Sequence, residues 1–168
     1  MVDQPGLWML DPELYRMGIV VVGCYDIACP YVSVLAEATG ASTFPLGVAS
    51  AGLTILSFLP EKPIERYMES HDLASGHGSE HGQGLLRQRI AETRERGWAV
   101  NPGLIVEGSW GMGAAVFDTA GQPAWALSLT GIESRFAPER RDEMGRLLMH
   151  HAHELTKKLR GEQALPAR

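Results

Sequence analysis

The sequence predicts an α+β domain in which helices flank an antiparallel sheet. Between residues 49 and 96, apolar residues recur mostly at the spacing of helices. Between residues 98 and 130 they alternate as in strands, and from Pro138 to about Leu159 the helical spacing returns. Helices, then neighbouring strands, then a helix is the order of an α+β domain rather than of repeated β-α units.

The composition is that of one ordinary soluble globular domain, with 168 residues, 45% of them hydrophobic and 21% charged. The formal net charge of -5 argues against direct binding of DNA, because nucleic-acid binders carry a basic face. The N-terminus MVDQPGLWML lacks the features of a signal peptide, and the apolar run from Gly47 to Leu59 is too short to span a bilayer. We therefore expect a cytoplasmic protein without a membrane partner.

The first half of the chain is expected to be mainly helical. The run from Tyr15 to Tyr25 is apolar and fits either a strand or a buried helix. Pro30 suits the first turn of a helix that Gly40 ends. Three further helices are expected at Ala49–Leu59, Pro63–Ser70 and Leu85–Arg96. The glycine-rich stretch Ser75–Gly84 between them is expected to be a mobile loop.

The second half is expected to supply the sheet. Asp118–Gln122 has the composition of a hairpin turn. The helix that begins at Pro138 closes the domain, and residues after Leu159 lose helical spacing and are expected to fray. The predicted strands are Trp98–Val100, Leu104–Glu107, Met112–Asp118 and Pro123–Thr130.

The last strand has one bulky face and one small face. Strand side chains alternate, so the residues at odd positions share one face and those at even positions share the other. The bulky face belongs in a core, whereas the small face ends in two hydroxyl groups that can donate and accept hydrogen bonds. The bulky residues are Trp125, Leu127 and Leu129, and the small ones are Ala124, Ala126, Ser128 and Thr130.

A small sheet face needs a cover, and the apolar helix Ala49–Leu59 is the candidate. The partner strand is also small-sided, with Gly111 and Gly113. The first turn of the helix, Ala49–Gly52, presents backbone N–H groups that suit an anion. The pattern therefore predicts a pocket for a small carboxylate or carbonyl compound. The other interpretation is that the small face only lets the helix approach closely.

The sequence indicates no metal site, cofactor or catalytic residue. His77 and His81 lie among glycines and are expected in a solvated loop, with a zinc site that uses His71, His77 or His81 as the less favoured alternative. His150, His151 and His153 are expected on a solvated helix surface. Cys24 and Cys29 lack zinc-ligand spacing and are expected to be reduced thiols. Ser128 and Cys24 have no motif that supplies a general base, so a hydrolase is the less favoured alternative.

The segments RERGWAVN, GMGAAVFD, ALSLTG and SRFAPER resemble, in this order, the C-terminal half of the effector domain of IclR-type bacterial transcription regulators. PLGVASAGLTILSFLPE resembles a helix of the same domain, and ACPYVSVLAEATGAS resembles its first helix. LWMLDPELYRMG is similar to the end of the winged helix-turn-helix and the connecting helix that precede the sensor in the family. The resemblance covers most of the chain and is most specific in its final third.

The resemblance implies a GAF- or profilin-like α+β sensor domain that binds a small organic acid or carbonyl metabolite and forms dimers or tetramers. DNA would be bound only through a helix-turn-helix outside this chain. The resemblance also divides the chain into a wing and linker remnant over 1–27, an effector-binding domain over 28–160 and a flexible tail over 161–168. By position, the ligand contacts implied by the resemblance are Ser50, Ala51, Gly52, Asn101, Gly111, Met112, Ser128 and Thr130.

The chain departs from the family pattern in its sheet and around the site. Roughly thirty residues that form early strands in the family are missing between Thr43 and Phe44, which predicts a shortened sheet. Gly47 and Leu53 stand where the family has histidine and lysine, and Ala115 stands where a strand proline is usual. Two further alternatives therefore remain: a stand-alone small-molecule binding module, and a degenerate fragment without a working pocket.

Overall fold

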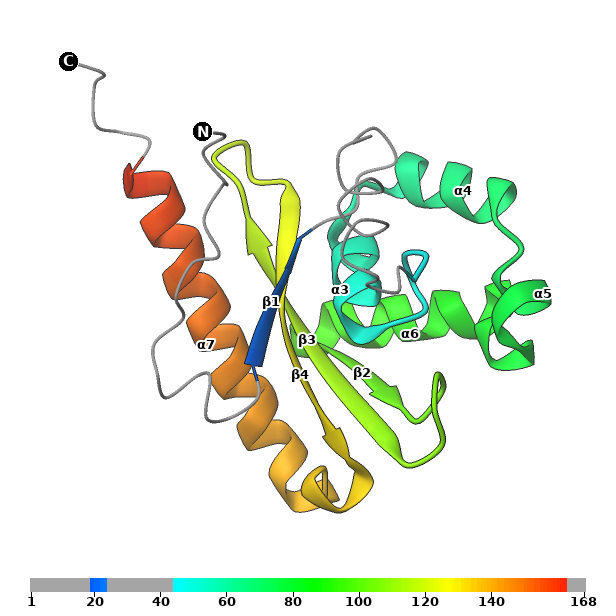
Figure 1. Ribbon diagram of the computed structural model, residues 1–168. Coiled ribbons are helices and arrows are strands. Elements are labelled where there is room, and N and C mark those ends of the chain that lie inside the picture. Colours follow the sequence, from blue (N-terminus) through cyan, green and yellow to red (C-terminus); the bar gives the residue numbers. More distant parts are fainter. Residues whose placement is uncertain (1–18, 24–43, 163–168) are drawn as a thin grey trace, which may run out of the picture.

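A computed structural model of the chain describes residues 19–23 and 44–162 and shows a sheet between two helical layers (Figure 1). The helices α3 to α6 lie on one side of the sheet, and the long helix α7 lies on the other. The predicted α+β class, with helices flanking an antiparallel sheet, is confirmed.

The sheet has four antiparallel strands in the order β1-β4-β3-β2. The hairpin of β3 and β4 is confirmed, and its turn is closed by two bonds between Asp118 and Gln122. The Asp118 N–H donates to the Gln122 carbonyl (2.9 Å), and the Gln122 N–H donates to Asp118 Oδ1 (2.8 Å). The strands are β1 (Ile19–Gly23), β2 (Ala99–Pro102), β3 (Ser109–Phe117) and β4 (Pro123–Ile132).

The four helices predicted between residue 49 and the C-terminus form with small changes at their ends. Gly97, at φ +91° in the left-handed region, ends α6 as expected, and its N–H donates to the Thr93 carbonyl (2.8 Å). No helix in residues 44–162 combines the length and apolar character needed to cross a membrane. The helices are α3 (Ser50–Phe58), α4 (Glu61–Ser70), α5 (Leu73–His77), α6 (Gln83–Arg96) and α7 (Pro138–Glu162), with 3₁₀ turns η1 (Ser79–His81) and η2 (Glu133–Arg135).

In the apolar run Tyr15–Tyr25, for which the sequence allows a strand or a helix, residues Ile19–Gly23 form the strand β1. This strand pairs with β4 from Leu129 to Trp125. β1 lies within the segment 1–27 and is an edge strand of this sheet, and the assignment of 1–27 to a wing and linker remnant stays a prediction. Three consecutive valines favour a strand, since β-branched side chains lose rotamer freedom in a helix. The helix expected after Pro30 and both cysteines lie outside the described residues.

The two faces of β4 pack against different helical layers, as the alternation predicts. Leu127 is buried in a cluster on the α7 side, and Trp125 and Leu129 pack against it. Ala126 is buried in the other cluster, among residues of α3, α4 and α6. The bulky face of the strand therefore supports the long C-terminal helix, and the small face receives α3.

The strand predicted at Leu104–Glu107 is wrong, because this segment is a loop between β2 and β3. Gly103 and Gly108 bound it at φ +74° and +75°, a conformation that interrupts a ladder. The Leu104 N–H donates to Asn101 Oδ1 (2.9 Å) instead of to a neighbouring strand. Ile105 and Val106, which suggest a strand by composition, are exposed in this loop.

The mobile loop predicted at Ser75–Gly84 is also wrong, since α5 and η1 occupy most of it. Asp72 caps α5 by accepting from the Ser75 N–H (3.3 Å), and Leu73 is buried. His81 is 1% exposed rather than solvated, and its Nδ1–H donates to the His77 carbonyl (3.0 Å). Burial, and then the nearby positive charge of Arg89, lower the pKa of His81.

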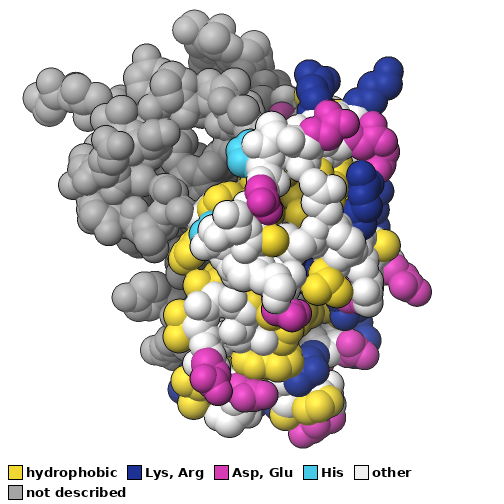
Figure 2. All heavy atoms as spheres, turned by 90° about the vertical axis from the view of Figure 1, so that its right-hand side faces the viewer, with side chains coloured by type: hydrophobic (Ala, Val, Ile, Leu, Met, Phe, Trp, Pro, Cys, Tyr) yellow, Lys and Arg dark blue, Asp and Glu magenta, His cyan; other side chains and the backbone are white. Residues whose placement is uncertain are grey.

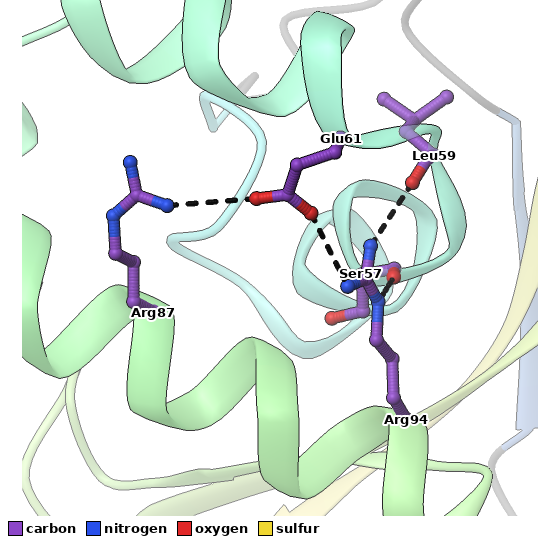
Figure 3. A network of polar contacts seen from close by, with 5 residues as sticks. All are labelled: Ser57, Leu59, Glu61, Arg87 and Arg94. Carbon is purple, nitrogen blue, oxygen red and sulfur yellow. Dashed lines mark hydrogen bonds and ion pairs between the residues drawn. The ribbon is translucent and has the colours of Figure 1, made fainter.

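The C-terminus of α3 is held by the guanidinium of Arg94 from α6 (Figure 3). Arg94 donates to the carbonyls of Ser57 and Leu59 and to Glu61 Oε2. Carbonyls at a helix end lack intrahelical partners, and a cation there also offsets the negative end of the helix dipole. Arg87 of the same helix contributes only an exposed ion pair with Glu61 (3.6 Å).

Replacing Arg94 is therefore expected to destabilise the domain far more than replacing Arg87. Arg94→Ala leaves the α3 carbonyls without their donor and is expected to lower the free energy of unfolding by about 1–2 kcal/mol. Arg87→Ala removes a surface ion pair and is expected to cost less than about 0.5 kcal/mol. Urea denaturation of both variants measures the difference, and equal losses would contradict this role for Arg94.

His81 is expected to make stability depend on pH. Its lowered pKa means that the unfolded chain binds a proton more readily, so the contribution is complete above about pH 6.5 and is lost as the pH falls below that value. His81→Asn keeps a donor near the His77 carbonyl and removes the titration. The free energy of unfolding, measured between about pH 8 and about pH 5, is expected to vary less in this variant. His153→Asn, at an exposed position of α7, is the matched control and is expected to keep the wild-type dependence.

Candidate functional site

A cavity of about 460 Å³ lies between the start of α3, the β2–β3 loop and the adjoining ends of β3 and β4. This volume is within the range of small-molecule binding sites. Most of the surrounding side chains are apolar, and the polar groups come from a few positions. The lining residues are Phe44, Leu46, Ala49, Ser50, Ala51, Gly52, Ile55, Asn101, Ile105, Val106, Ser109, Trp110, Gly111, Ser128 and Thr130.

Seven of the eight residues selected from the sequence line this cavity, and Met112 does not. Met112 follows Gly111 in a strand, so its side chain lies on the opposite face of the sheet. There it is fully buried in the cluster that packs against α7. Trp125 also packs on that side, and Ser128 and Thr130 line the cavity, as the alternation of β4 requires. That any of these residues contacts a ligand stays a prediction.

The polar end of the cavity is the first turn of α3. Ala49 is the N-cap, no side chain caps the helix, and no acidic residue occupies its first turn. The first N–H groups of a helix have no intrahelical acceptor and carry a partial positive charge. Ser50, Ala51 and Gly52 all line the cavity, so this end suits a carboxylate or a carbonyl oxygen.

The turn that precedes α3 is fixed by two side chains from other elements. The Tyr67 hydroxyl donates to the Leu46 carbonyl (2.9 Å), and Asn101 Nδ2 donates to the Val48 carbonyl (2.7 Å). Burial raises the pKa of Tyr67 to about 12, so this donor stays protonated. Asn101, selected as a ligand contact, lines the cavity but uses its amide to join the helix start to the β2–β3 loop.

Two hydroxyl groups meet at the floor of the cavity. Ser50 Oγ and Ser128 Oγ are 3.3 Å apart, and Ser128 Oγ also donates to the Met112 carbonyl at 3.3 Å. Ser128 is 8% exposed, whereas Thr130, two residues along the same face, is exposed at the mouth. Both contacts are long for hydroxyl hydrogen bonds, so these hydroxyls can turn toward another polar group.

Glycines in β3 let α3 lie almost against the sheet. A Cβ atom at Gly113 would lie 2.7 Å from the Ser50 carbonyl oxygen, and one at Gly111 would lie 2.9 Å from Ser50 Oγ. Thr54 Oγ1 uses this closeness to donate to the Gly113 carbonyl (2.9 Å). Both interpretations of the small sheet face therefore apply, at different places along the strands. At Gly113 the face lets the helix pack closely, and from Gly111 toward Thr130 it borders the cavity.

None of the described residues that line the cavity carries a charged side chain. In the described part of the chain, no group of three or more His, Cys, Asp or Glu residues is placed to hold a metal ion. Eight lining residues lie outside the set predicted from the sequence. Ile105 and Val106 are the most informative of them, because their apolar pattern predicts a buried strand rather than the rim of a cavity.

The family model described as bacterial transcriptional regulator IclR C-terminal matches residues 16–157. The chain belongs to the IclR family. It is 28% identical over 116 residues to the HTH-type transcriptional regulator KipR of Bacillus subtilis, covering 68% of this chain and 46% of that protein. It is 25% identical over 132 residues to the transcriptional repressor IclR of Escherichia coli, covering 78% and 48% respectively. The chain thus spans about half the length of these curated relatives.

Solved structures of similar proteins agree with the fold. The Agobacterium tumefaciens repressor BlcR superposes with a TM-score of 0.68 at 24% identity, covering 88% of this chain and 61% of that chain. The Thermotoga maritima IclR gives a TM-score of 0.68 at 21% identity, covering 88% and 64%. At these identities the likeness shows the fold alone.

In this member of the IclR family, a side chain at Gly113 is expected to displace α3 from the sheet. Gly113→Ala places a methyl group within contact of the Ser50 backbone and is expected to cost about 1–3 kcal/mol of folding free energy. Gly84→Ala in α6 is the matched control, since nothing lies within 4 Å of the added atom. That control is expected to be neutral or stabilising by up to about 1 kcal/mol. Urea denaturation compares the two, and a neutral Gly113→Ala would contradict the close contact.

Proposed function

We propose that this chain is the effector-sensing and oligomerising part of an IclR-type transcription regulator. It binds a small organic acid or carbonyl metabolite and thereby controls DNA binding by a helix-turn-helix that is attached to it or carried by a partner. The single observation that supports this most is the cavity whose polar end is the first turn of α3.

The polar groups of the cavity suit one oxyanion or carbonyl group. The N–H groups of Ser50, Ala51 and Gly52 supply donors, and the helix dipole favours negative charge there by about 0.3–2 kcal/mol. The hydroxyls of Ser128 and Thr130, on the opposing strand, supply donors or acceptors for the same group or for its neighbour.

The site supports binding rather than catalysis. The hydroxyl of Ser128 contacts the hydroxyl of Ser50 and the carbonyl of Met112, and neither is a general base for nucleophilic attack. The curated relatives KipR and IclR are transcription regulators. A hydrolase that uses Ser128 or Cys24 is therefore the weaker proposal, and Cys24 lies outside the described residues.

Control of DNA binding would have to act through a partner surface or an attached domain. On the face of the molecule formed by α4, α5 and α6, basic and acidic side chains are interspersed with exposed apolar ones (Figure 2). This mixture, with the net charge of -5, fits a sensor better than a DNA-binding surface. A ligand can shift the assembly only by its difference in affinity for two arrangements of the subunits, in a dimer or tetramer.

A thermal-shift screen against small carboxylic and carbonyl acids tests the proposal. An acid that binds is expected to raise the melting temperature, because it stabilises only the folded state. The double variant Ser128→Ala/Thr130→Val removes both hydroxyls of β4 and is expected to lose most of this shift. Ser134→Ala, at an exposed position of η2, is the control and is expected to keep it.

The thermal-shift screen, followed by turnover, sedimentation and DNA-binding measurements on any acid that binds, separates the alternatives. Chemical turnover of a bound acid would support the enzyme, and a folded domain that responds to no acid would support the degenerate fragment. A bound acid that leaves the sedimentation coefficient and the DNA binding of the intact regulator unchanged would support a stand-alone binding module.

A further inference from the structure

The outer wall of the cavity is an exposed apolar loop. Ile105 and Val106 line the cavity although they are 39% and 61% exposed to solvent. Exposed apolar surface is costly in water, and where it borders a cavity it gains most when a ligand covers it. The other half-exposed apolar residue near this end, Ile132, is 62% exposed and does not line the cavity.

The loop is held by three hydrogen bonds. Asn101 accepts from the Leu104 N–H (2.9 Å), and the Gly108 carbonyl accepts from the Glu133 N–H (2.9 Å). Within the loop, the Val106 carbonyl accepts from the Ser109 N–H (2.9 Å). These bonds hold Ile105 and Val106 beside the cavity, with their side chains exposed to solvent.

The cavity is too large for a two- or three-carbon acid to fill. Its volume of about 460 Å³ corresponds to roughly fifteen water molecules at about 30 Å³ each. Within the part of the chain that the structure describes, no charged side chain lines the cavity, and the first turn of α3 can compensate only part of one negative charge. The remaining space is bounded by apolar groups, including Ile55 of α3 and the two loop residues.

Building on the proposed function, we propose that Ile105 and Val106 determine specificity by covering the apolar body of the ligand. The ligand class is then a monocarboxylate whose single polar end lies at the first turn of α3 and whose hydrocarbon body extends along the β2–β3 loop. Compact polar acids and dicarboxylates fit less well, because they leave the loop exposed or bring a second charge into an uncharged cavity.

Isothermal titration of the intact chain with acetate, butyrate, hexanoate and octanoate tests this, with pyruvate and adipate as the compact and the doubly charged probes. Beyond butyrate, the affinity is expected to rise by up to about fourfold per added methylene, which corresponds to about 0.8 kcal/mol. Val106→Ser is expected to weaken octanoate binding by about three- to tenfold and to change acetate binding by less than about twofold.

Ile132→Ser is the matched control, since Ile132 is as exposed as Val106 but lies outside the cavity. It is expected to leave every affinity unchanged. If pyruvate or acetate binds as tightly as octanoate, or if both variants weaken octanoate equally, the specificity proposal is overturned while the sensing function stands. If no acid of either kind binds to the folded chain, both proposals fall.

Discussion

The contact on which the rest of the structure depends is the close approach of α3 to the glycine-bearing face of β3. The Ser50 carbonyl lies where a side chain at Gly113 would have to be, and Thr54 donates to the carbonyl of that glycine. A helix this near the sheet has little freedom to slide or tilt, because both partners are backbone. Its first turn is therefore fixed beside Ser128, and the space between them and Thr130 becomes the cavity.

Other elements keep α3 in this position from both ends. Arg94 holds its last carbonyls, and Tyr67 and Asn101 hold the turn before its first residue. The polar end of the cavity is thus organised before a ligand arrives, so a ligand there loses little free energy to ordering the protein. The β2–β3 loop carries the exposed apolar residues of the wall, and these are the residues whose surroundings a bound ligand would change most.

The sequence predicts the parts of this arrangement that depend on periodicity. The alternation along β4 separates Leu127 from Ser128 correctly, and the apolar stretch after Ala49 is the helix that covers the small face. Periodicity fails where a tertiary contact decides. Ile105 and Val106 have strand-forming side chains, but Gly103, Gly108 and the amide of Asn101 turn the backbone away from the ladder. Asn101 lines the cavity as well as joining two segments, and the sequence does not predict this joining role because the tertiary fold brings its partners Val48 and Leu104 together.

Local composition misleads at residues 75–84. Four glycines between Ser75 and Gly84 suggest a mobile loop, yet the cap at Asp72 and the burial of Leu73 and His81 order the segment. Met112, which is implied by the family pattern, does not line the cavity, because a residue next to Gly111 in a strand lies on the opposite face. The alternation of side chains along a strand decides which face a residue lies on. For this purpose it is a better guide than a position carried over from a family pattern.

The polar end and the apolar end of the cavity would contribute differently to the binding of the proposed ligand. Hydrogen bonds and the helix dipole at Ser50–Gly52 replace bonds that the ligand makes with water, so they contribute orientation more than net affinity. Apolar contact with Ile55 and the loop residues has no such compensation, because water gains by being released from both surfaces. Because the lining residues that the structure describes are uncharged, the hydrocarbon part of the proposed ligand would supply most of the binding free energy, and the polar end would mainly orient it.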